Sequence, residues 1–587
     1  MRAGDVEAPG RWIAQHPRRS GLLAGLACGL LMVLAYPPVW LWGLVFVAPL
    51  PLSLVSWHAR ERALTCAFWC AIGVSPWWLL AHIWVARVSA FGVVPLVIVL
   101  SALTGLAVWC AAGVHRRLGW SVWAWGLIWV GFEFLRGQII AGGYAWYFLA
   151  HPLAGQGFLV WPAALVGTYA VSLLVTLPAV TVVCWSVGRR RAAMVTAAVC
   201  VAWAGAGLVI DPWPDATGSL RVGVVQTNVP QDVKIDWTMG QRFEDWQAMK
   251  ALIAAAGAQH PDVIALPEAM SPGWTLDAVS LAHERRKMLE FERRAPDGVM
   301  ERYPVTLFAD ELILMQGALR TPIMIGGPGF EGLHIEPDEQ RRFRYNADKR
   351  YNSVFVIEDG KAPTKRYDKV ALTPFGEYMP YISQWGWLEE RLLGIGAAGM
   401  QFDLDAGTSA QALEVRLVDG RTITVAAPVC FEATMPWVCR RLVGGAGEAQ
   451  VMINLTNDGW FGWWMPGREH HMLTARWRCL ELGVPMVRVA NTGISGAFDQ
   501  RGREISRGVA DPATGRAVLG RGSGTAVIEI PTVSGRTIYT RVGDVGGWGC
   551  LAATGGLVVA AVARGRSKRR KDEDGERDGS LAGAPGS

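Results

Sequence analysis

Long apolar runs dominate the first third of the chain and return once near its end. They cover approximately residues 20–36, 37–57, 64–84, 92–114, 118–135, 162–186, 191–210 and 545–563. Runs of about 17–25 apolar residues are long enough for a helix to cross a bilayer core of about 30 Å. The pattern therefore predicts a seven-helix transmembrane domain over 20–210 and an eighth transmembrane helix at 545–563.

Basic residues flank these runs on alternate sides. They gather before the first run, in every second loop and after the last run: Arg2, Arg11, Arg18, Arg19, Arg60, Arg62, Arg116, Arg117, Arg189, Arg190, Arg191, Arg564, Arg566 and residues 568–571. The short opposite loops carry chiefly Arg87 and Arg136. By the positive-inside rule, the amino terminus (1–19) and the basic, charged tail (564–587) are cytoplasmic, and the block 215–540 lies on the far side of the membrane.

Two polar features stand out in this half of the chain. Glu133 and Arg136 end the fifth run one helical turn apart. They form either an ion pair at a helix end or a contact with a lipid headgroup, since ionisable groups within membranes are often functional. Residues 566–580 contain no apolar side chain, and such a charge run predicts a disordered end that touches anionic lipid.

From Leu220 onward the pattern changes to short runs rich in Val and Ile. Buried strands are predicted at 220–226, 262–268, 322–327, 353–359, 422–430, 450–455, 485–490 and 525–530, and an amphipathic helix at 470–483. This alternation predicts an α/β layered domain over 215–540. Residues 273–345 are charged and weakly periodic, so we interpret them as an insertion with a mobile part.

Composition agrees with a chain that lies largely in lipid. Hydrophobic residues make up 51% and charged residues only 18%, against about 25% charged residues in a soluble domain. The 29 Trp residues suit membrane–water boundaries. The net charge of +6 follows the loop pattern, so it does not indicate a nucleic-acid partner.

Cysteine spacing and glycine patterns exclude several classes of site. Seven of the ten Cys residues lie inside apolar runs, and no CxxC pair or Cys/His ligand spacing occurs. Neither a disulfide framework nor a zinc site is indicated, and we expect no metal and no cofactor. No phosphate-binding loop of the GxxxxGK[ST] type occurs, which argues against an ATP-driven machine.

Three polar residues stand at or just beyond predicted strand ends. Glu268 closes DVIALPE, Cys430 closes TITVAAPVC, and Lys369 lies in the loop after the 353–359 strand. Ligands bind at the carboxyl ends of strands in open α/β sheets. A thiol nucleophile, a carboxylate base and an ammonium that favours the thiolate and later the oxyanion make an acyl-transfer site. Each residue alone is weak evidence, because a buried Cys is more often an inert hydrophobe.

The order of short motifs carries a family resemblance. LPE, YDK and VCFE resemble the Glu–Lys–Cys signature of the nitrilase superfamily. VGVVQTNVPQDVK, LPEAMSP, KVALTPFGEYMP, NDGWFG and TIYTRVGD are similar to its membrane-embedded bacterial branch, the apolipoprotein N-acyltransferases. The resemblance implies an α-β-β-α sandwich on the periplasmic side of eight transmembrane helices in the bacterial inner membrane.

The resemblance also implies a reaction in lipoprotein biosynthesis. Cys430 takes an acyl chain from a phospholipid as a thioester, and the N-terminal amine of a diacylglyceryl apolipoprotein then accepts it. Glu268 is base and acid in turn, while Lys369, with the backbone N–H of Phe431, holds the oxyanion. Two-step transfer of this kind gives ping-pong kinetics.

Further residues carry over by motif, each with a plainer interpretation beside it. Glu377 orients Lys369 and the amine, or makes a loop salt bridge. Glu432 orders the site, or is an ordinary hydrogen-bonding neighbour. Trp460, Phe461 and Trp437 wall the acyl chain, or are core aromatics. Asn352, His471, Arg478, Glu481, Arg488 and Asn491 are interpreted as scaffold.

The chain departs from the family pattern directly after Lys369. After Lys369 the family usually has one or two His residues, whereas this chain has Val370, Ala371 and Leu372.

An anchored hydrolase or amidase is the main alternative function, because the same three residues could pass the acyl group to water. A transporter or an inactive scaffold is the second alternative. Neither predicts that Glu268, Lys369 and Cys430, which we call the triad, are all present. The expected partners are phospholipid, apolipoprotein and membrane, with a monomer as the expected state.

Overall fold

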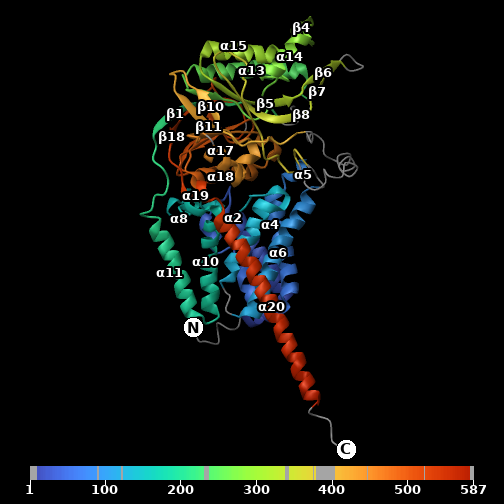
Figure 1. Ribbon diagram of the computed structural model, residues 1–587, viewed down its shortest axis with the longest axis vertical. Coiled ribbons are helices and arrows are strands. Elements are labelled where there is room, and N and C mark those ends of the chain that lie inside the picture. The colour runs from blue at the N-terminus through green and yellow to red at the C-terminus, as the bar shows by residue number, and fades with distance from the viewer. Residues whose placement is uncertain are drawn as a thin grey trace, which may run out of the picture.

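The computed structural model consists of a helical bundle with an α/β domain stacked on one end (Figure 1). It describes residues 10–88, 92–119, 123–230, 237–295, 297–337, 343–374, 376–378, 404–445, 447–520 and 522–581. The bundle is formed by the chain up to about residue 210 together with the last helix, and the α/β domain by the residues between them.

The bundle contains long helices joined by short helical turns. Its elements are α2 (Pro17–Ala35), η1 (Trp42–Phe46), α3 (Leu50–His58), η2 (Arg60–Arg62), α4 (Ala63–His82), α5 (Val85–Val88), α6 (Val93–Leu118), α7 (Ala124–Phe134), η3 (Leu135–Ile139), η4 (Ile140–Gly142), η5 (His151–Gly155), α8 (Gly157–Val160), α9 (Ala163–Val166), α10 (Thr168–Ser186), α11 (Arg190–Ala206) and α20 (Val545–Leu581). Among the described residues, five helical segments are long and apolar enough to cross a membrane: Pro17–Ala35, Arg60–His82, Val93–Leu118, Thr168–Ser186 and Val545–Ser567. The chain is thus a multi-pass membrane protein.

The other three predicted spans are shorter than the apolar pattern suggested. The 37–57 run is divided into η1 and α3, with Pro49 and Pro51 at the start of α3. The 118–135 run contributes the 11-residue α7, which passes into the π-helical turn η3. The 191–210 run forms α11, which has 17 residues and begins with two arginines. The described residues therefore show five candidate spans and do not show eight.

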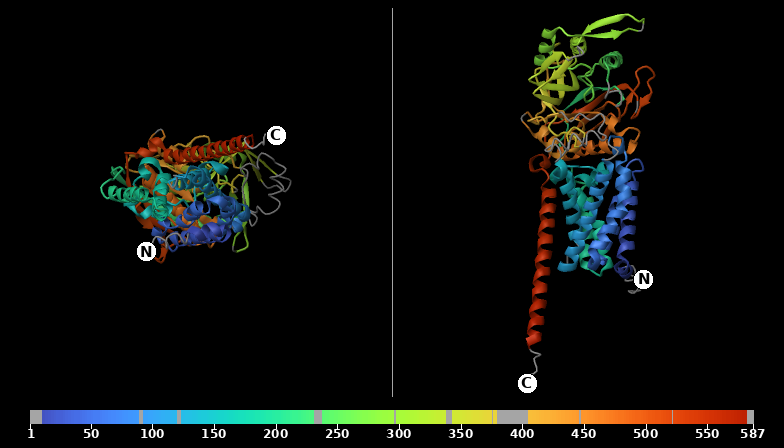
Figure 2. Two further views of the ribbon diagram at one scale, coloured as in Figure 1. Left: turned by 90° about the horizontal axis from the view of Figure 1, so that it is seen from below. Right: turned by 90° about the vertical axis from the view of Figure 1, so that its right-hand side faces the viewer.

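Helix α20 differs from the expected disordered tail. It continues without a break from the candidate span to Leu581, and Figure 2 shows it extending beyond the end of the bundle. The prediction of disorder for residues 566–580 is therefore wrong. Lys, Arg and Glu have high helix propensity, so a charged sequence with few helix breakers can extend an existing helix. Residues 582–587 lie outside the described part.

The α/β domain contains two large sheets. The first has the order β17-β16-β18-β1-β2-β5-β8-β9 and the second β10-β11-β12-β13-β14-β15, beside the hairpins β3-β4 and β6-β7. The strands are β1 (Gly218–Gln226), β2 (Val263–Ala265), β3 (Glu290–Arg294), β4 (Met300–Pro304), β5 (Ile323–Glu331), β6 (His334–Pro337), β7 (Phe343–Asn346), β8 (Lys349–Ile357), β9 (Arg366–Asp368), β10 (Leu413–Arg416), β11 (Thr422–Ala426), β12 (Val451–Thr456), β13 (Met486–Ala490), β14 (Gly496–Phe498), β15 (Glu504–Arg507), β16 (Val509–Ala510), β17 (Ala517–Val518) and β18 (Gly524–Thr532). Every strand predicted from the sequence is present, though β2 and β11 are shorter than predicted.

Helices cover the outer faces of the two sheets: α13 (Met239–Gly257) and α15 (Leu307–Leu319) on the first, α17 (Pro436–Gly444) and α18 (Met465–Leu482) on the second. The domain also contains α14 (Ala278–Lys287), η6 (Cys430–Thr434), η7 (Asp458–Phe461) and α19 (Ile538–Val542). In β1, Val222 and Val224 point into the core between the sheets, while Val225 joins the core under α13 and α15. Both sheet faces are buried, which explains the continuous apolar strands. The predicted α-β-β-α sandwich is confirmed.

The segment 273–345 is more than an insertion. It contains the charged hairpin β3-β4, but also α15 and the central strand β5. Phe308 and Leu312 of α15 are 1% exposed and belong to the core under the first sheet. The sequence interpretation is therefore wrong for α15, whose apolar positions were obscured by the charges on either side.

The two halves of the molecule share one hydrophobic core. A single cluster of buried residues runs from the membrane helices into the space between the sheets. Hydrogen bonds cross the junction from the Tyr147 backbone N–H to His470 Nε2 at 3.0 Å and from Trp477 Nε1 to the His151 carbonyl at 3.0 Å. The Thr168 backbone N–H donates to Glu481 Oε1 at 3.1 Å. The α/β domain is thus packed against the bundle rather than tethered to it.

Glu133 and Arg136 hold the loop that forms this junction. Glu133 Oε1 accepts from the Leu149 backbone N–H at 2.7 Å, and Arg136 donates to the Tyr144 and Trp146 carbonyls at 3.3 and 2.5 Å. Both side chains are buried. Their hydrogen bonds shape the loop between the bundle and the α/β domain, which neither sequence interpretation anticipated.

Candidate active site

The structure brings Glu268, Lys369 and Cys430 together at the ends of strands from both sheets. Glu268 follows β2, Lys369 follows β9 directly, and Cys430 lies beyond β11 at the start of η6. All three are buried, at 6%, 1% and 7% exposure. Lys369 Nζ lies 3.4 Å from Glu268 Oε1, and the charges of both act on the Cys430 thiol. The convergence expected from the strand ends is therefore present.

Two left-handed backbone positions shape these loops. Cys430 has φ = 50°, and Ala269, next to Glu268, has φ = 51°. Non-glycine residues in this region are strained, and such strain gathers at functional sites. Gly326 of β5 permits the close packing of the Glu268 loop, since a Cβ there would lie 2.5 Å from Ala269 N and 2.7 Å from Glu268 Cα.

Lys369 is shared between two carboxylates. Its Nζ lies 3.0 Å from Glu377 Oε1 and 2.8 Å from Glu377 Oε2, in addition to the contact with Glu268. Glu377 is fixed in turn, because the Thr373 backbone N–H donates to its Oε2 at 2.7 Å. Glu377 forms a salt bridge, and its partner is Lys369 itself, so the contact agrees with both interpretations of Glu377.

Asn352 joins the two carboxylates and was interpreted from the sequence only as scaffold. Its side-chain Nδ2 donates to Glu268 Oε1 at 2.8 Å and to Glu377 Oε1 at 3.2 Å. Its backbone carbonyl accepts from the backbone N–H of Lys369 at 2.9 Å. It lies on β8, beside the strand that leads to Lys369. The available signal was its sequence position, directly before the predicted strand 353–359 that leads towards Lys369.

Burial and neighbouring charges set the protonation of the site. Burial favours a neutral Lys369, but the negative charges of Glu377 and Glu268 outweigh it and raise the pKa of Lys369 above its ordinary value. Burial opposes ionisation of Glu377, yet Lys369 and its hydrogen bonds lower the pKa of that carboxyl. Burial, reinforced by Glu268 and opposed by Lys369, raises the pKa of Cys430 to about 12. The raised pKa of Cys430 favours the thiol at neutral pH, which agrees with the sequence interpretation that a carboxylate base accepts the thiol proton.

Glu432 ties the lysine loop to the cysteine loop. Its carboxylate accepts hydrogen bonds from the backbone N–H groups of Val429, Val370 and Ala371 at 2.8, 2.7 and 3.0 Å, and from the Tyr367 hydroxyl at 2.9 Å. Burial raises the pKa of Glu432 to about 7, against the effect of these donors. Val370 and Ala371 contribute only their backbone N–H groups to this connection, so it does not depend on the identity of their side chains.

The three candidate aromatic residues lie in different places. Phe461 is buried at the junction, with its ring 4.6 Å from Trp84 and 5.6 Å from Trp146 of the membrane half. Trp460 is half-buried in η7. Trp437 lies in α17, where the Arg441 guanidinium carbon is 5.0 Å from the centroid of its ring. Among the described residues, no hydrogen bond or ring contact joins Trp437 to the triad.

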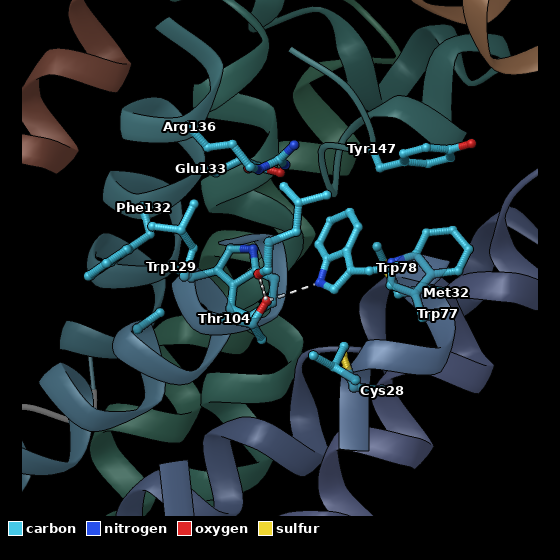
Figure 3. A pocket seen from close by; sticks show the side chains of 14 residues that line it. Cys28, Met32, Trp77, Trp78, Thr104, Trp129, Phe132, Glu133, Arg136 and Tyr147 are labelled. Atoms are coloured by element: carbon cyan, nitrogen blue, oxygen red, sulfur yellow. Dashed lines mark hydrogen bonds between the residues drawn. The ribbon is translucent and has the colours of Figure 1, made fainter. Parts of the chain in front are cut away.

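A cavity lies within the bundle below the junction. It has a volume of about 40 Å³ and is lined by residues of α2, α4, α6 and α7 together with Arg136 and Tyr147. Figure 3 shows Glu133 and Arg136 at one end and Cys28 near the other, with Trp77, Trp78 and Trp129 in the wall between them. None of the triad residues lines it. The cavity therefore offers an apolar chamber with one polar end inside the membrane half.

The described residues contain no group of three or more His, Cys, Asp and Glu side chains that could hold a metal ion.

A sandwich of this kind, with a glutamate, a lysine and a cysteine at its strand ends, defines a carbon–nitrogen hydrolase. The carbon–nitrogen hydrolase family matches residues 221–514, half of the chain, and the chain belongs to this family. The apolipoprotein N-acyltransferase N-terminal domain matches residues 28–181. Together the two matches make the chain a member of the apolipoprotein N-acyltransferases.

Full-length relatives agree with this assignment. The chain is 27% identical over 574 residues to the apolipoprotein N-acyltransferase of Geobacter metallireducens, covering 93% of this chain and 96% of the relative. It is 29% identical over 512 residues to that of Sinorhizobium medicae, covering 82% and 86%. Among solved structures, an amidase from Nesterenkonia sp. is 14% identical, with a TM-score of 0.33, covering 56% of this chain and 94% of that one.

Proposed function

We propose that this enzyme transfers a fatty acyl chain from a membrane phospholipid to the N-terminal amine of the diacylglyceryl cysteine of apolipoproteins, through a thioester on Cys430. The observation that carries the proposal is the buried Glu268–Lys369–Cys430 group packed directly above a membrane bundle. A soluble nitrile or amide needs no bundle, whereas two lipid-linked substrates reach the site from the bilayer.

In the first half-reaction, the Cys430 sulfur attacks the ester carbonyl of the phospholipid. The thiol proton passes to Glu268 as the C–S bond forms, which suits a thiol whose pKa is far above neutral. Lys369, with the backbone N–H of Phe431, stabilises the negative charge on the tetrahedral oxygen. Glu268 then returns the proton to the departing alkoxide, so lysophospholipid leaves and the thioester remains.

In the second half-reaction, the apolipoprotein amine attacks the thioester carbonyl. Glu268, now ionised again, takes a proton from the attacking nitrogen and returns it to the sulfur as the C–S bond breaks. Glu377 keeps Lys369 in place and accepts a hydrogen bond from the amine. The products are the N-acylated lipoprotein and the free Cys430 thiol.

The cavity in the bundle supports the lipid part of this proposal. Its walls are mostly apolar, and Glu133 and Arg136 at its polar end hold the loop that lies against the α/β domain. We propose that Trp460, Phe461 and Trp437 line the path of the acyl chain above the cavity. For topology we propose eight crossings, with α3, α7 and α11 completing the set, both termini in the cytoplasm and the α/β domain in the periplasm.

Intact-mass spectrometry of the purified enzyme after incubation with phospholipid alone tests the proposal. We expect a fatty-acyl adduct on Cys430 that a diacylglyceryl-cysteine peptide discharges rapidly and water discharges slowly. The variant Cys430→Ser is expected to form no adduct, while Cys439→Ser, a buried cysteine whose thiol contacts the Glu432 carbonyl, should retain it. Rapid discharge by water would indicate a hydrolase, and a folded enzyme without an adduct would overturn the proposal.

A further inference from the structure

The end of the bundle farthest from the α/β domain is rich in positive charge (Figure 1). Arginines lie at the start of α2, in η2, at the end of α6, at the start of α11 and within α20. Between residues 10 and 210 the only acidic residues are Glu61 and Glu133. Glu133 holds the junction loop at the other end, and Glu61 pairs with Arg116 at 3.0 Å. The bundle thus supplies one carboxylate to this whole set of cations.

One tryptophan gathers two of these arginines. Trp57 lies in the last turn of α3 and is 8% exposed. The guanidinium carbons of Arg60 and Arg189 lie over its ring, 4.9 and 5.3 Å from the centroid. The His115 ring of α6 packs against the same indole at 5.1 Å. Since cation–π contacts favour a guanidinium at the face of a tryptophan, Trp57 brings together two cations from distant parts of the chain.

A backbone carbonyl also holds each of the two guanidinium groups. Arg60 donates from Nη1 to the Trp57 carbonyl at 3.0 Å, and Arg189 donates from Nη2 to the Gly119 carbonyl after α6. Neither arginine forms an ion pair with a carboxylate of the described residues. Because a guanidinium has five N–H donors, each side chain keeps donors for a ligand.

This arrangement favours an anion with several oxygens. Guanidinium groups bind phosphate through paired N–H donors in a fixed plane. Arg60 and Arg189 are half-buried, and the indole ring and the two carbonyls already restrict their side chains. A ligand that binds them therefore pays less of the entropy cost of ordering two long side chains.

The surroundings of the pair suit a lipid headgroup rather than a soluble ion. Tryptophan gathers at membrane–water boundaries, and Trp185 at the end of α10 is 53% exposed, with the Arg190 guanidinium over its ring at 4.6 Å. About one turn further along α10 and α11, Val182 and Met194 are 46% and 58% exposed. A phospholipid fits both features, with its phosphate at the arginines and its acyl chains along the helices.

The pair lies across the membrane from the active site. Helix α10 begins at Thr168, which bonds to Glu481 of the α/β domain, and ends at Ser186, shortly before Arg189. Its 19 residues span about 28 Å, close to the thickness of a bilayer core. A lipid bound at Arg189 is therefore in the leaflet opposite the α/β domain, and it is not the acyl donor at Cys430.

We propose that Arg60 and Arg189, arranged around Trp57, bind the phosphate of an anionic phospholipid in the leaflet away from the α/β domain. The excess of arginines at this end favours an anionic over a zwitterionic lipid. The bound lipid connects α3, α6 and the α10–α11 turn, whose residues form the site. The inference is separate from the reaction at Cys430 and does not depend on the proposed function.

Native mass spectrometry of the full-length enzyme in detergent tests the site. The enzyme is titrated with phosphatidylglycerol, or with phosphatidylcholine of the same acyl chains. The variant is Arg60→Gln with Arg189→Gln, and its control is Arg18→Gln with Arg19→Gln, which removes the same charge from exposed positions at the same end. We expect one tightly bound phosphatidylglycerol in the wild type and the control, and an affinity about 30-fold lower in the variant.

Equal losses in the two double variants would overturn the proposal, because net charge alone would then explain the binding. Equal retention of phosphatidylcholine by the wild type, or displacement of phosphatidylglycerol by inorganic phosphate at the same concentration, would overturn the assignment to an anionic lipid. If the Gln pair does not fold, Arg60→Lys with Arg189→Lys takes its place. Lysine keeps the charge but lacks the planar guanidinium, so a lower affinity supports the site and wild-type affinity overturns it.

Discussion

At the scale of single residues, the active site depends on how one buried ammonium is shared. Lys369 lies within 3.4 Å of two carboxylates, and Asn352 donates to both of them. Without the amide, two negative charges would share one cation in a space that excludes water. Asn352 thus keeps Glu268 and Glu377 at separate places on the same lysine.

Replacing Asn352 by Leu tests this role. The variant keeps the size of the side chain and removes both donors, so Glu268 loses its fixed position. We expect kcat to fall about 10–100-fold, a part of the usual contribution of a positioned base. Ser353→Ala, at the next residue of β8, removes a hydroxyl bonded to Asp368 instead and should retain activity. An Asn352→Leu enzyme with unchanged kcat would contradict the assignment.

The raised pKa of Cys430 predicts a pH dependence. With a folded pKa of about 12, the thiolate fraction increases about tenfold per pH unit throughout the neutral range. Alkylation of Cys430 by iodoacetamide should therefore accelerate steadily from pH 7 to 9 without a plateau, as followed by peptide mass spectrometry. A plateau near pH 7 would show that the resting residue is a thiolate.

At the scale of elements, strand ends and the loops after them carry the site, and this explains what the sequence could predict. The apolar runs identified every strand that leads to the triad except the three-residue β9. The hydrogen bonds that join Asp458 to His471 and Arg488 could not be predicted, because residues from η7, α18 and β13 meet only through the packing of the second sheet. The sequence did not predict α15, because charged residues lie on either side of its apolar positions. It overestimated the lengths of the spans at 37–57 and 191–210, where prolines or arginines interrupt the apolar run.

Gly326→Ala tests the packing between β5 and the Glu268 loop. A Cβ would meet backbone atoms at 2.5 and 2.7 Å, which cannot be relieved by a side-chain rotation. We expect a loss of stability of about 1–3 kcal/mol and a larger loss of acylation than the lower melting temperature alone explains. Gly240→Ala is the control, since nothing lies within 4 Å of its Cβ position in α13.

At the scale of the whole molecule, the shared core makes the bundle and the α/β domain one cooperative unit. Glu481 accepts from the backbone and the hydroxyl of Thr168, and it pairs with Arg478 at 3.2 Å. The three groups are buried at the junction. Breaking one of these contacts should weaken both halves together.

Thr168→Val measures this coupling. The variant keeps the shape of the side chain but removes one donor to a buried carboxylate, at a cost of about 1–3 kcal/mol. We expect the melting temperature to fall, with tryptophan fluorescence and accessibility of Cys430 changing in a single transition. Two separate transitions would show that the halves unfold independently. Thr181→Val, whose hydroxyl bonds remain within the bundle, is the matched comparison.

Because α20 returns the chain to the bundle (Figure 2) and packs against α7, the catalytic domain is anchored at both of its ends. It cannot swing about a single hinge, so the Cys430 sulfur stays at one fixed height relative to the helices. Substrates that are themselves confined to a lipid layer then meet the enzyme by diffusion in a plane. The quantity that governs turnover is consequently the number of substrate molecules per unit of membrane area, and diluting the membranes in buffer leaves it unchanged.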